Sequence, residues 1–125
     1  MDIRNYRDLR VWQTSLELVT DVYRLTESFP AYERFLLTTQ LRRAGISIVS
    51  NIAEGHGRST RGEHLRHISM ARGSANEVEA QLFIAEGLGY TDKETLAVAR
   101  ERCESICRML KRLKRALAEK RRSQD

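Results

Sequence analysis

The chain has 125 residues, of which 41% are hydrophobic and 31% charged, and its formal net charge is +5. This composition is typical of one folded domain and excludes wholesale disorder. No apolar run approaches the roughly 18 residues that cross a bilayer, and no apolar segment follows the first charged residues as in a secretory signal. With only two cysteines, we therefore expect a cytoplasmic protein that makes no membrane contact.

The first helix is predicted over 8–27, with Asp8 as its N-cap and Phe29-Pro30 breaking the chain after it. Its apolar residues form two seams at steps of three and four. One seam contains Leu9, Trp12, Leu16, Val19 and Tyr23, and the second contains Val11, Leu18, Val22 and Leu25. Two seams present more apolar surface than one neighbouring helix can cover.

Three more helices are predicted over 32–54, 60–87 and 92–119. Glycines end the second and third, and capping boxes at Thr60–Glu63 and Thr91–Glu94 open the third and fourth. The chain shows no strand pattern. Long helices with short loops predict an all-α, up-down-up-down antiparallel four-helix bundle that forms a single domain over 1–125. Small residues on the second and third helices predict that these two pack most tightly, and the basic tail after about Glu119 is predicted to fray.

The second helix carries a polar stripe directly beside its apolar seam. The stripe contains Gln40, Arg43, Ser47, Asn51 and Glu54, again at steps of three and four. Serine and asparagine are mediocre helix formers, so propensity alone does not account for them. The stripe is interpreted either as a hydrogen-bonding surface for a subunit or a nucleic acid, or as a helix face that happens to be polar.

The excess positive charge is concentrated at the C-terminal end, where residues 100–125 hold ten basic and four acidic side chains. Arginine binds phosphate through two parallel hydrogen bonds, so one interpretation of this charge is a polyanion partner. The other is a solvated helix end, because cations also favour the negative end of the helix dipole. The candidate phosphate contacts are Arg42, Arg43, Arg58, Arg61, Arg108, Lys111, Arg112 and Arg115.

The sequence offers little support for catalysis, a metal or a cofactor. No histidine follows a glutamate at the Glu-x-x-His spacing of di-iron bundles, and no His-Glu-x-x-His zinc pattern is present. Cys103 and Cys107 lie four apart on one helix, a spacing that suits a disulfide poorly. A metal-free nuclease could use His56, His64 or His67 near Glu54, but no residue pattern in the sequence pairs a nucleophile or base with an orienting group. We therefore predict no cofactor, no metal and no enzyme activity.

Longer motifs carry a family resemblance. The run from Leu37 to Arg58, which includes Gln40-Leu41-Arg42-Arg43 and Asn51-Ile52-Ala53-Glu54-Gly55, resembles the hallmark of the 23S rRNA intervening-sequence protein family. Further matching segments, in chain order, are Asp8-Leu9-x-Val11-Trp12-Gln13, Phe29-Pro30-x-x-Glu33, Ala71-x-Gly73-Ser74-x-x-Glu77-x-Glu79-x-Gln81-Leu82 and Leu88-Gly89-Tyr90. A related bundle is the accessory protein of diversity-generating retroelements, which works with a reverse transcriptase and RNA.

This resemblance implies a four-helix bundle that forms a ring-shaped homopentamer and has no established catalytic activity. The ring would use the second seam of the first helix, at Val11, Leu18, Val22 and Leu25, as its subunit contact. The first hypothesis is therefore a non-enzymatic, oligomeric nucleic-acid-binding protein, with RNA favoured over DNA. The alternative is an oligomeric scaffold for a protein partner such as a polymerase, without nucleic-acid affinity of its own.

Overall fold

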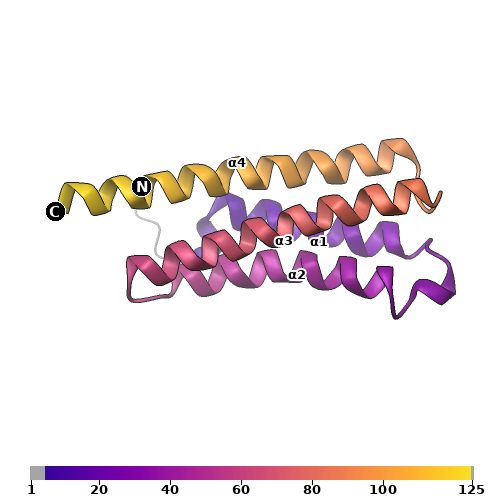
Figure 1. The fold of residues 1–125 in the computed structure, drawn as a ribbon, viewed down its shortest axis with the longest axis horizontal. Coiled ribbons are helices and arrows are strands. Elements are labelled where there is room, and N and C mark those ends of the chain that lie inside the picture. Colours follow the sequence, from indigo (N-terminus) through magenta and orange to yellow (C-terminus); the bar gives the residue numbers. More distant parts are fainter. Residues whose placement is uncertain (1–4, 125) are drawn as a thin grey trace.

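The structure, a computed structural model, describes residues 5–124, and the side chains of residues 5–119. Over that range the elements are the short 3-10 helix η1 (Tyr6–Asp8), α1 (Arg10–Thr26), the 3-10 helix η2 (Ala31–Glu33), α2 (Leu37–His56), α3 (Arg61–Gly87) and α4 (Lys93–Gln124). The four long helices run antiparallel in sequence order, so the α2–α3 turn and the end of α4 lie at one end of the bundle (Figure 1). The predicted all-helical four-helix bundle is confirmed.

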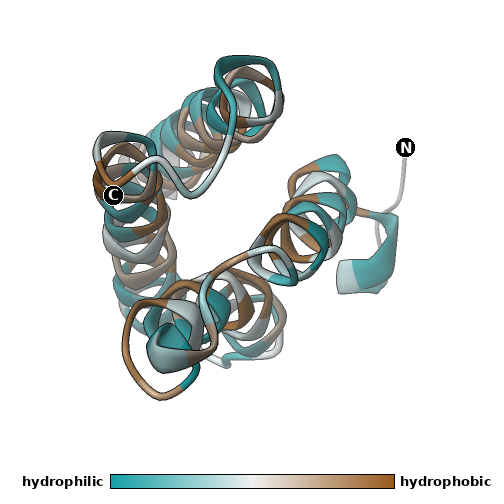
Figure 2. Ribbon diagram, turned by 90° about the vertical axis from the view of Figure 1, so that its right-hand side faces the viewer, coloured by the Kyte–Doolittle hydropathy of each residue, from teal (hydrophilic) through white to brown (hydrophobic). Residues whose placement is uncertain are grey.

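Each helix packs beside its neighbours in sequence, and α1 also contacts α4, so the helices surround one core (Figure 2). The contact between α2 and α3 is the most extensive of these, as the small residues predicted. In the last turn of α2, a Cβ added to Gly55 would lie 2.7 Å from the Cβ of His67 on α3. Glycine at position 55 is what permits this approach.

The caps of α3 and α4 follow local capping chemistry, with one difference from expectation. The Thr60 side chain accepts the N–H of Glu63 at the start of α3, as predicted. The cap of α4 is Asp92 rather than Thr91, since its carboxylate accepts the N–H of Thr95 at 2.7 Å. The pKa of Asp92 is lowered, chiefly because that N–H stabilises its charged form.

The starts of α1 and α2 differ from expectation because short 3-10 turns precede them, and α4 differs because it is longer than predicted. Asp8 belongs to η1, and Leu9 precedes α1 without a side-chain cap. After Pro30 the chain forms η2, so α2 begins at Leu37 rather than near residue 32. The helix α4 continues to Gln124, which corrects the expectation that it ends near Glu119.

The core includes the seam of α1 that was predicted to face another subunit. Val11, Leu18, Val22 and Leu25 are all buried within this single chain, and Leu18 and Val22 are fully inaccessible. The prediction that they line a subunit contact is wrong, because they have no surface left to offer. The other seam is only partly covered: Leu9 and Trp12 pack against the core, whereas Leu16 is 45% and Tyr23 39% exposed.

Among the described residues, no helix is long and apolar enough to cross a membrane. Cys103 is buried, Cys107 is half-buried, and both are free thiols.

Candidate nucleic-acid interface

A cationic groove runs between the N-terminal half of α3 and the C-terminal half of α4. It contains a cavity of about 240 Å³, whose floor is formed by the core residues Ile68 and Leu110. The rest of the lining is polar or small: Ser69, Arg72, Gly73, Asn76, Lys111 and Lys114. Three cations and no carboxylate line this cavity, so its chemistry suits an anion.

Helical spacing explains why these cations meet. Arg72 follows Ile68 by four residues and Lys114 follows Leu110 by four, so each lies directly beside a core position on its own helix. We call these lining cations, Arg72, Lys111 and Lys114, the groove cations. The prediction from sequence included Lys111 but not Arg72 or Lys114, because it considered the charge of α4 alone and not the residues of α3 that pack against α4.

The remaining predicted cations of α4 extend this surface outward. Arg108, Arg112 and Arg115 are all exposed and recur at steps of four and three, so they share one face of the helix. Arg108 and Arg115 lie three residues before and four residues after the groove residue Lys111, so that face adjoins the groove. The structure thus gathers four of the eight predicted phosphate contacts on α4.

Arg42 and Arg43 do not join that surface. Arg42 lies over the ring of Tyr23, with its Cζ atom 4.3 Å from the ring centroid, and its Nε donates to Thr26 Oγ1 at 2.9 Å. It therefore bridges α2 to α1, on the opposite side of the bundle from α3 and α4. Arg43 is exposed on α2. Arg58 and Arg61 lie at the α2–α3 turn, at the same end of the bundle as the basic part of α4 (Figure 1).

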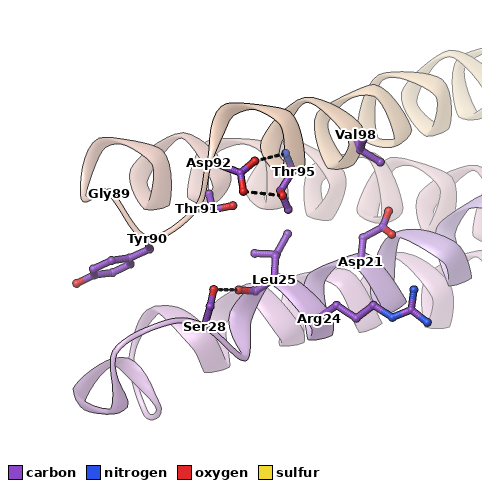
Figure 3. Close-up of a pocket in the computed structure, with 10 residues that line it drawn as sticks. All are labelled: Asp21, Arg24, Leu25, Ser28, Gly89, Tyr90, Thr91, Asp92, Thr95 and Val98. Atoms are coloured by element: carbon purple, nitrogen blue, oxygen red, sulfur yellow. Dashed lines mark hydrogen bonds between the residues drawn. The ribbon is translucent and has the colours of Figure 1, made fainter.

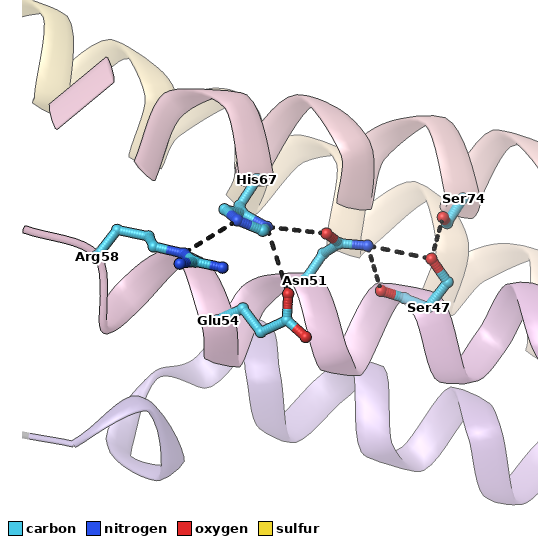
Figure 4. Close-up of polar contacts among 6 residues, drawn as sticks. All are labelled: Ser47, Asn51, Glu54, Arg58, His67 and Ser74. Atoms are coloured by element: carbon cyan, nitrogen blue, oxygen red, sulfur yellow. Dashed lines mark hydrogen bonds and ion pairs between the residues drawn. The ribbon is translucent and has the colours of Figure 1, made fainter. Parts of the chain in front are cut away.

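The polar stripe of α2 bonds to α3 of the same chain. Ser47 Oγ lies 2.8 Å from Ser74 Oγ, Asn51 Oδ1 lies 3.0 Å from His67 Nδ1, and Gln81 Nε2 donates to Gln40 Oε1 at 3.4 Å. Glu54 Oε2 is 3.8 Å from His67 Nδ1 (Figure 4). Four of the five stripe residues, all except the exposed Arg43, thus contact α3 of the same chain and form a ladder between the two helices.

The three histidines lie near this ladder without forming a metal site. The rings of His56 and His64 are 6.2 Å apart, edge to face. Burial lowers the pKa of His64, and the nearby His56 and His67 lower it further. Over the described residues, no group of three histidine, cysteine or acidic side chains could hold a metal ion.

The face between α1 and α4 has a different chemistry. It holds cavities of about 660 Å³ and 540 Å³. Arg102 lines the smaller cavity, where it is bound to Glu17, and its Nε lies 2.6 Å from Oδ2 of Asp21, which lines the larger one. Burial raises the pKa of Asp21, and Arg24 partly opposes that shift. Figure 3 shows Asp21, Arg24 and Asp92 around the apolar Leu25 and Val98 of the larger cavity. Both cavities on this face are lined by acidic as well as basic side chains, so the face does not suit a polyanion.

Comparison with known proteins supports the fold and gives the family. A family model described as the 23S rRNA-intervening sequence protein matches residues 7–112. The crystal structure of a protein of unknown function from the S23 ribosomal protein family of Bacteroides thetaiotaomicron is similar, with a TM-score of 0.78 and 24% sequence identity. The match covers 84% of this chain and 95% of that chain, and it establishes the shared fold. No curated protein shows significant similarity to the chain.

Proposed function

The chain belongs to the 23S rRNA-intervening sequence protein family, and from that premise we propose that it is a non-enzymatic, oligomeric nucleic-acid-binding protein of the cytoplasm, with RNA as its partner. The observation that carries this proposal is the α3–α4 groove, in which three cations and no carboxylate line one cavity. The exposed Arg108, Arg112 and Arg115 extend the same sign of charge along α4. A surface of this kind binds the phosphate backbone and reads little sequence.

A salt series tests the proposal directly. Each phosphate contact to duplex nucleic acid adds about −0.9 to the slope of log K against log salt. A variant that replaces all three groove cations with alanine is expected to lose affinity and about 2.7 units of slope in fluorescence anisotropy with labelled RNA. The matched control is Arg10→Ala/Arg24→Ala/Lys93→Ala, which removes the same charge from exposed positions away from the groove. Equal losses in both variants would contradict the groove and indicate a net-charge effect.

We also propose that copies of the chain assemble into a closed ring, for which the family resemblance implies five subunits. Support comes from large apolar side chains exposed on the neighbouring helices α1 and α2, where Leu16 is 45%, Tyr23 39% and Ile46 43% exposed. We call these three residues the α1–α2 face. Apolar side chains exposed together are typical of a protein contact. Light scattering on the purified protein measures the subunit number, and a monomeric mass at micromolar concentration would refute assembly.

The alternative function is an oligomeric scaffold that binds a protein partner and has no nucleic-acid affinity. It is favoured by large apolar side chains at the opposite end of the bundle: Tyr32, Phe35, Leu36, Ile84 and Leu88 are all more than half exposed. A hydrogen bond between the hydroxyls of Tyr32 and Tyr90 joins the two connections at that end. Protein capture that survives nuclease treatment, together with no RNA binding at low salt, would support the scaffold over the first proposal.

A further inference from the structure

A directional chain of hydrogen bonds leads from the middle of α3 to the α2–α3 turn (Figure 4). It starts at Ser74, whose Oγ lies 2.8 Å from Ser47 Oγ. Asn51 Nδ2 donates to Ser47 Oγ at 3.1 Å and to the Ser47 backbone carbonyl at 2.9 Å. A carbonyl oxygen only accepts, so this contact fixes which way the Asn51 amide points. Its Oδ1 therefore faces His67.

The orientation of Asn51 sets the position of the proton on His67. Asn51 Oδ1 accepts from His67 Nδ1 at 3.0 Å, so Nδ1 carries the hydrogen. In the neutral imidazole, Nε2 then has a free lone pair, and Arg58 Nε donates to it at 3.3 Å. The side chain of His67 is only 13% exposed, so the ring is held by its surroundings. The chain of bonds ends by orienting the guanidinium of Arg58.

The bond to His67 uses one of the five N–H groups of Arg58 and leaves the four on its terminal nitrogens. Beside it lies a cavity of about 320 Å³, lined by Arg58, Glu63, Arg66, His67 and Met70. Among the described residues, neither Arg58 nor Arg66 forms an ion pair with a carboxylate. Two arginines thus border one cavity without an ion pair to the Glu63 that also lines it, and His67 holds one of them, Arg58, in place.

We propose that this cavity binds one phosphodiester of the nucleic acid, with Arg58 as a two-pronged donor, Arg66 as the second cation and His67 as the residue that positions Arg58. The proposal rests on the proposed function and names a second contact for the same partner, outside the α3–α4 groove. A guanidinium fork matches two oxygens of a phosphate. The cavity also lies at the same end of the bundle as the basic half of α4, so one extended ligand could contact both (Figure 1).

The charges around the cavity favour a diester over a terminal phosphate. The arginines Arg58 and Arg66 contribute two positive charges to the lining, and Glu63 contributes one negative charge. The net charge of +1 matches the single charge of a phosphodiester. A terminal phosphate with two charges would leave one negative charge without a compensating cation in this lining. The ligand is therefore an internal phosphate of a strand rather than its end.

Two substitutions of His67 separate positioning from general stability. His67→Asn places an amide N–H near the position of Nδ1, so it retains a donor for Asn51 but offers nothing to Arg58. His67→Gln places an amide oxygen near Nε2, so it retains the acceptor for Arg58. The positioning role predicts that His67→Asn behaves like Arg58→Ala, whereas His67→Gln behaves like the unmodified chain. A purely structural role would make both variants behave according to their stability.

The experiment is a salt series with a labelled RNA duplex on the full chain and these variants, each first checked for folding by circular dichroism and urea denaturation. Arg58→Ala and His67→Asn are expected to lower the salt slope by about 0.9, the value of one phosphate contact. Glu63→Gln is expected to raise affinity, since it removes the opposing charge. An unchanged slope for Arg58→Ala, or indistinguishable slopes for His67→Asn and His67→Gln, would overturn the proposal.

The same series distinguishes this inference from the proposed function. If removal of the groove cations weakens binding while Arg58→Ala does not, the protein binds nucleic acid and only the second contact is refuted. If the unmodified chain binds no RNA even at low salt, both proposals are overturned.

Discussion

Two glycines inside long helices should respond to alanine in opposite directions. Glycine in a helix interior costs roughly 0.5–1 kcal/mol relative to alanine, so the substitution alone stabilises. At Gly73, no atom lies within 4 Å of an added Cβ, and the full gain of about 1 kcal/mol is expected. At Gly55, the added Cβ would lie 2.7 Å from His67 Cβ and 3.2 Å from His64 Cδ2. Neither neighbour is the free end of a flexible side chain, so α2 and α3 must move apart.

Overpacking of this kind typically costs about 1–3 kcal/mol. Because Gly73 lies in the interior of α3 and Gly55 in the last turn of α2, the propensity gain at Gly55 is no larger than at Gly73, and the difference in free energy of unfolding between Gly73→Ala and Gly55→Ala should be at least that cost. Urea slopes for small proteins are about 1–3 kcal/mol/M, so the two midpoints should differ by on the order of 1 M. The assay is urea denaturation followed by circular dichroism at one fixed protein concentration, since assembly would shift the midpoint. Equal midpoints for the two variants would refute the close approach of α2 and α3 at Gly55.

Three further outcomes are expected. Thr60→Ala should lower the free energy of unfolding by about 1 kcal/mol, because it removes the cap of α3. Thr91→Ala should have little effect, because Asp92 caps α4. Thermal or urea unfolding measures both variants. Burial raises the pKa of Cys103 to about 12, so a thiol reagent at pH 8 should label the half-buried Cys107 first. Peptide mapping by mass spectrometry measures the two labelling rates, and faster labelling of Cys103 would contradict the packing of α4. Ile46→Asp should lower the mass measured by light scattering without loss of helix content, and an unchanged mass would remove Ile46 from the subunit contact.

Local signals predicted most of the fold, because helix periodicity and capping depend on residues only a few positions apart. The Thr60 cap and the apolar seam of α4 follow from such spacing, and both are present. The choice between the two seams of α1 was wrong for a physical reason. Both seams have the same period and similar composition, and only the placement of α2 and α4 decides that Leu18 and Val22 face the core while Leu16 and Tyr23 face outward.

The candidate interface was harder to predict, because its parts come from different helices. Ser47 and Asn51 were recognised as unusual, yet their partners Ser74 and His67 are 27 and 16 residues away in the chain. Only the antiparallel register of α2 and α3 brings these side chains together. Arg72 was likewise invisible to a count of charge along α4, since its significance depends on the lysines across the groove.

The distribution of surface chemistry makes the two parts of the proposed function compatible. The α1–α2 face, proposed for assembly, lies on the opposite side of the bundle from the α3–α4 groove, proposed for nucleic acid (Figure 2). Contact between copies through the first surface would therefore leave the second open. Several weak phosphate-binding grooves on one ring would then act together on one long polyanion, because each further contact becomes intramolecular once the first has formed. A monomeric variant such as Ile46→Asp should consequently keep the salt slope of a single groove on a short duplex while it loses affinity for long RNA.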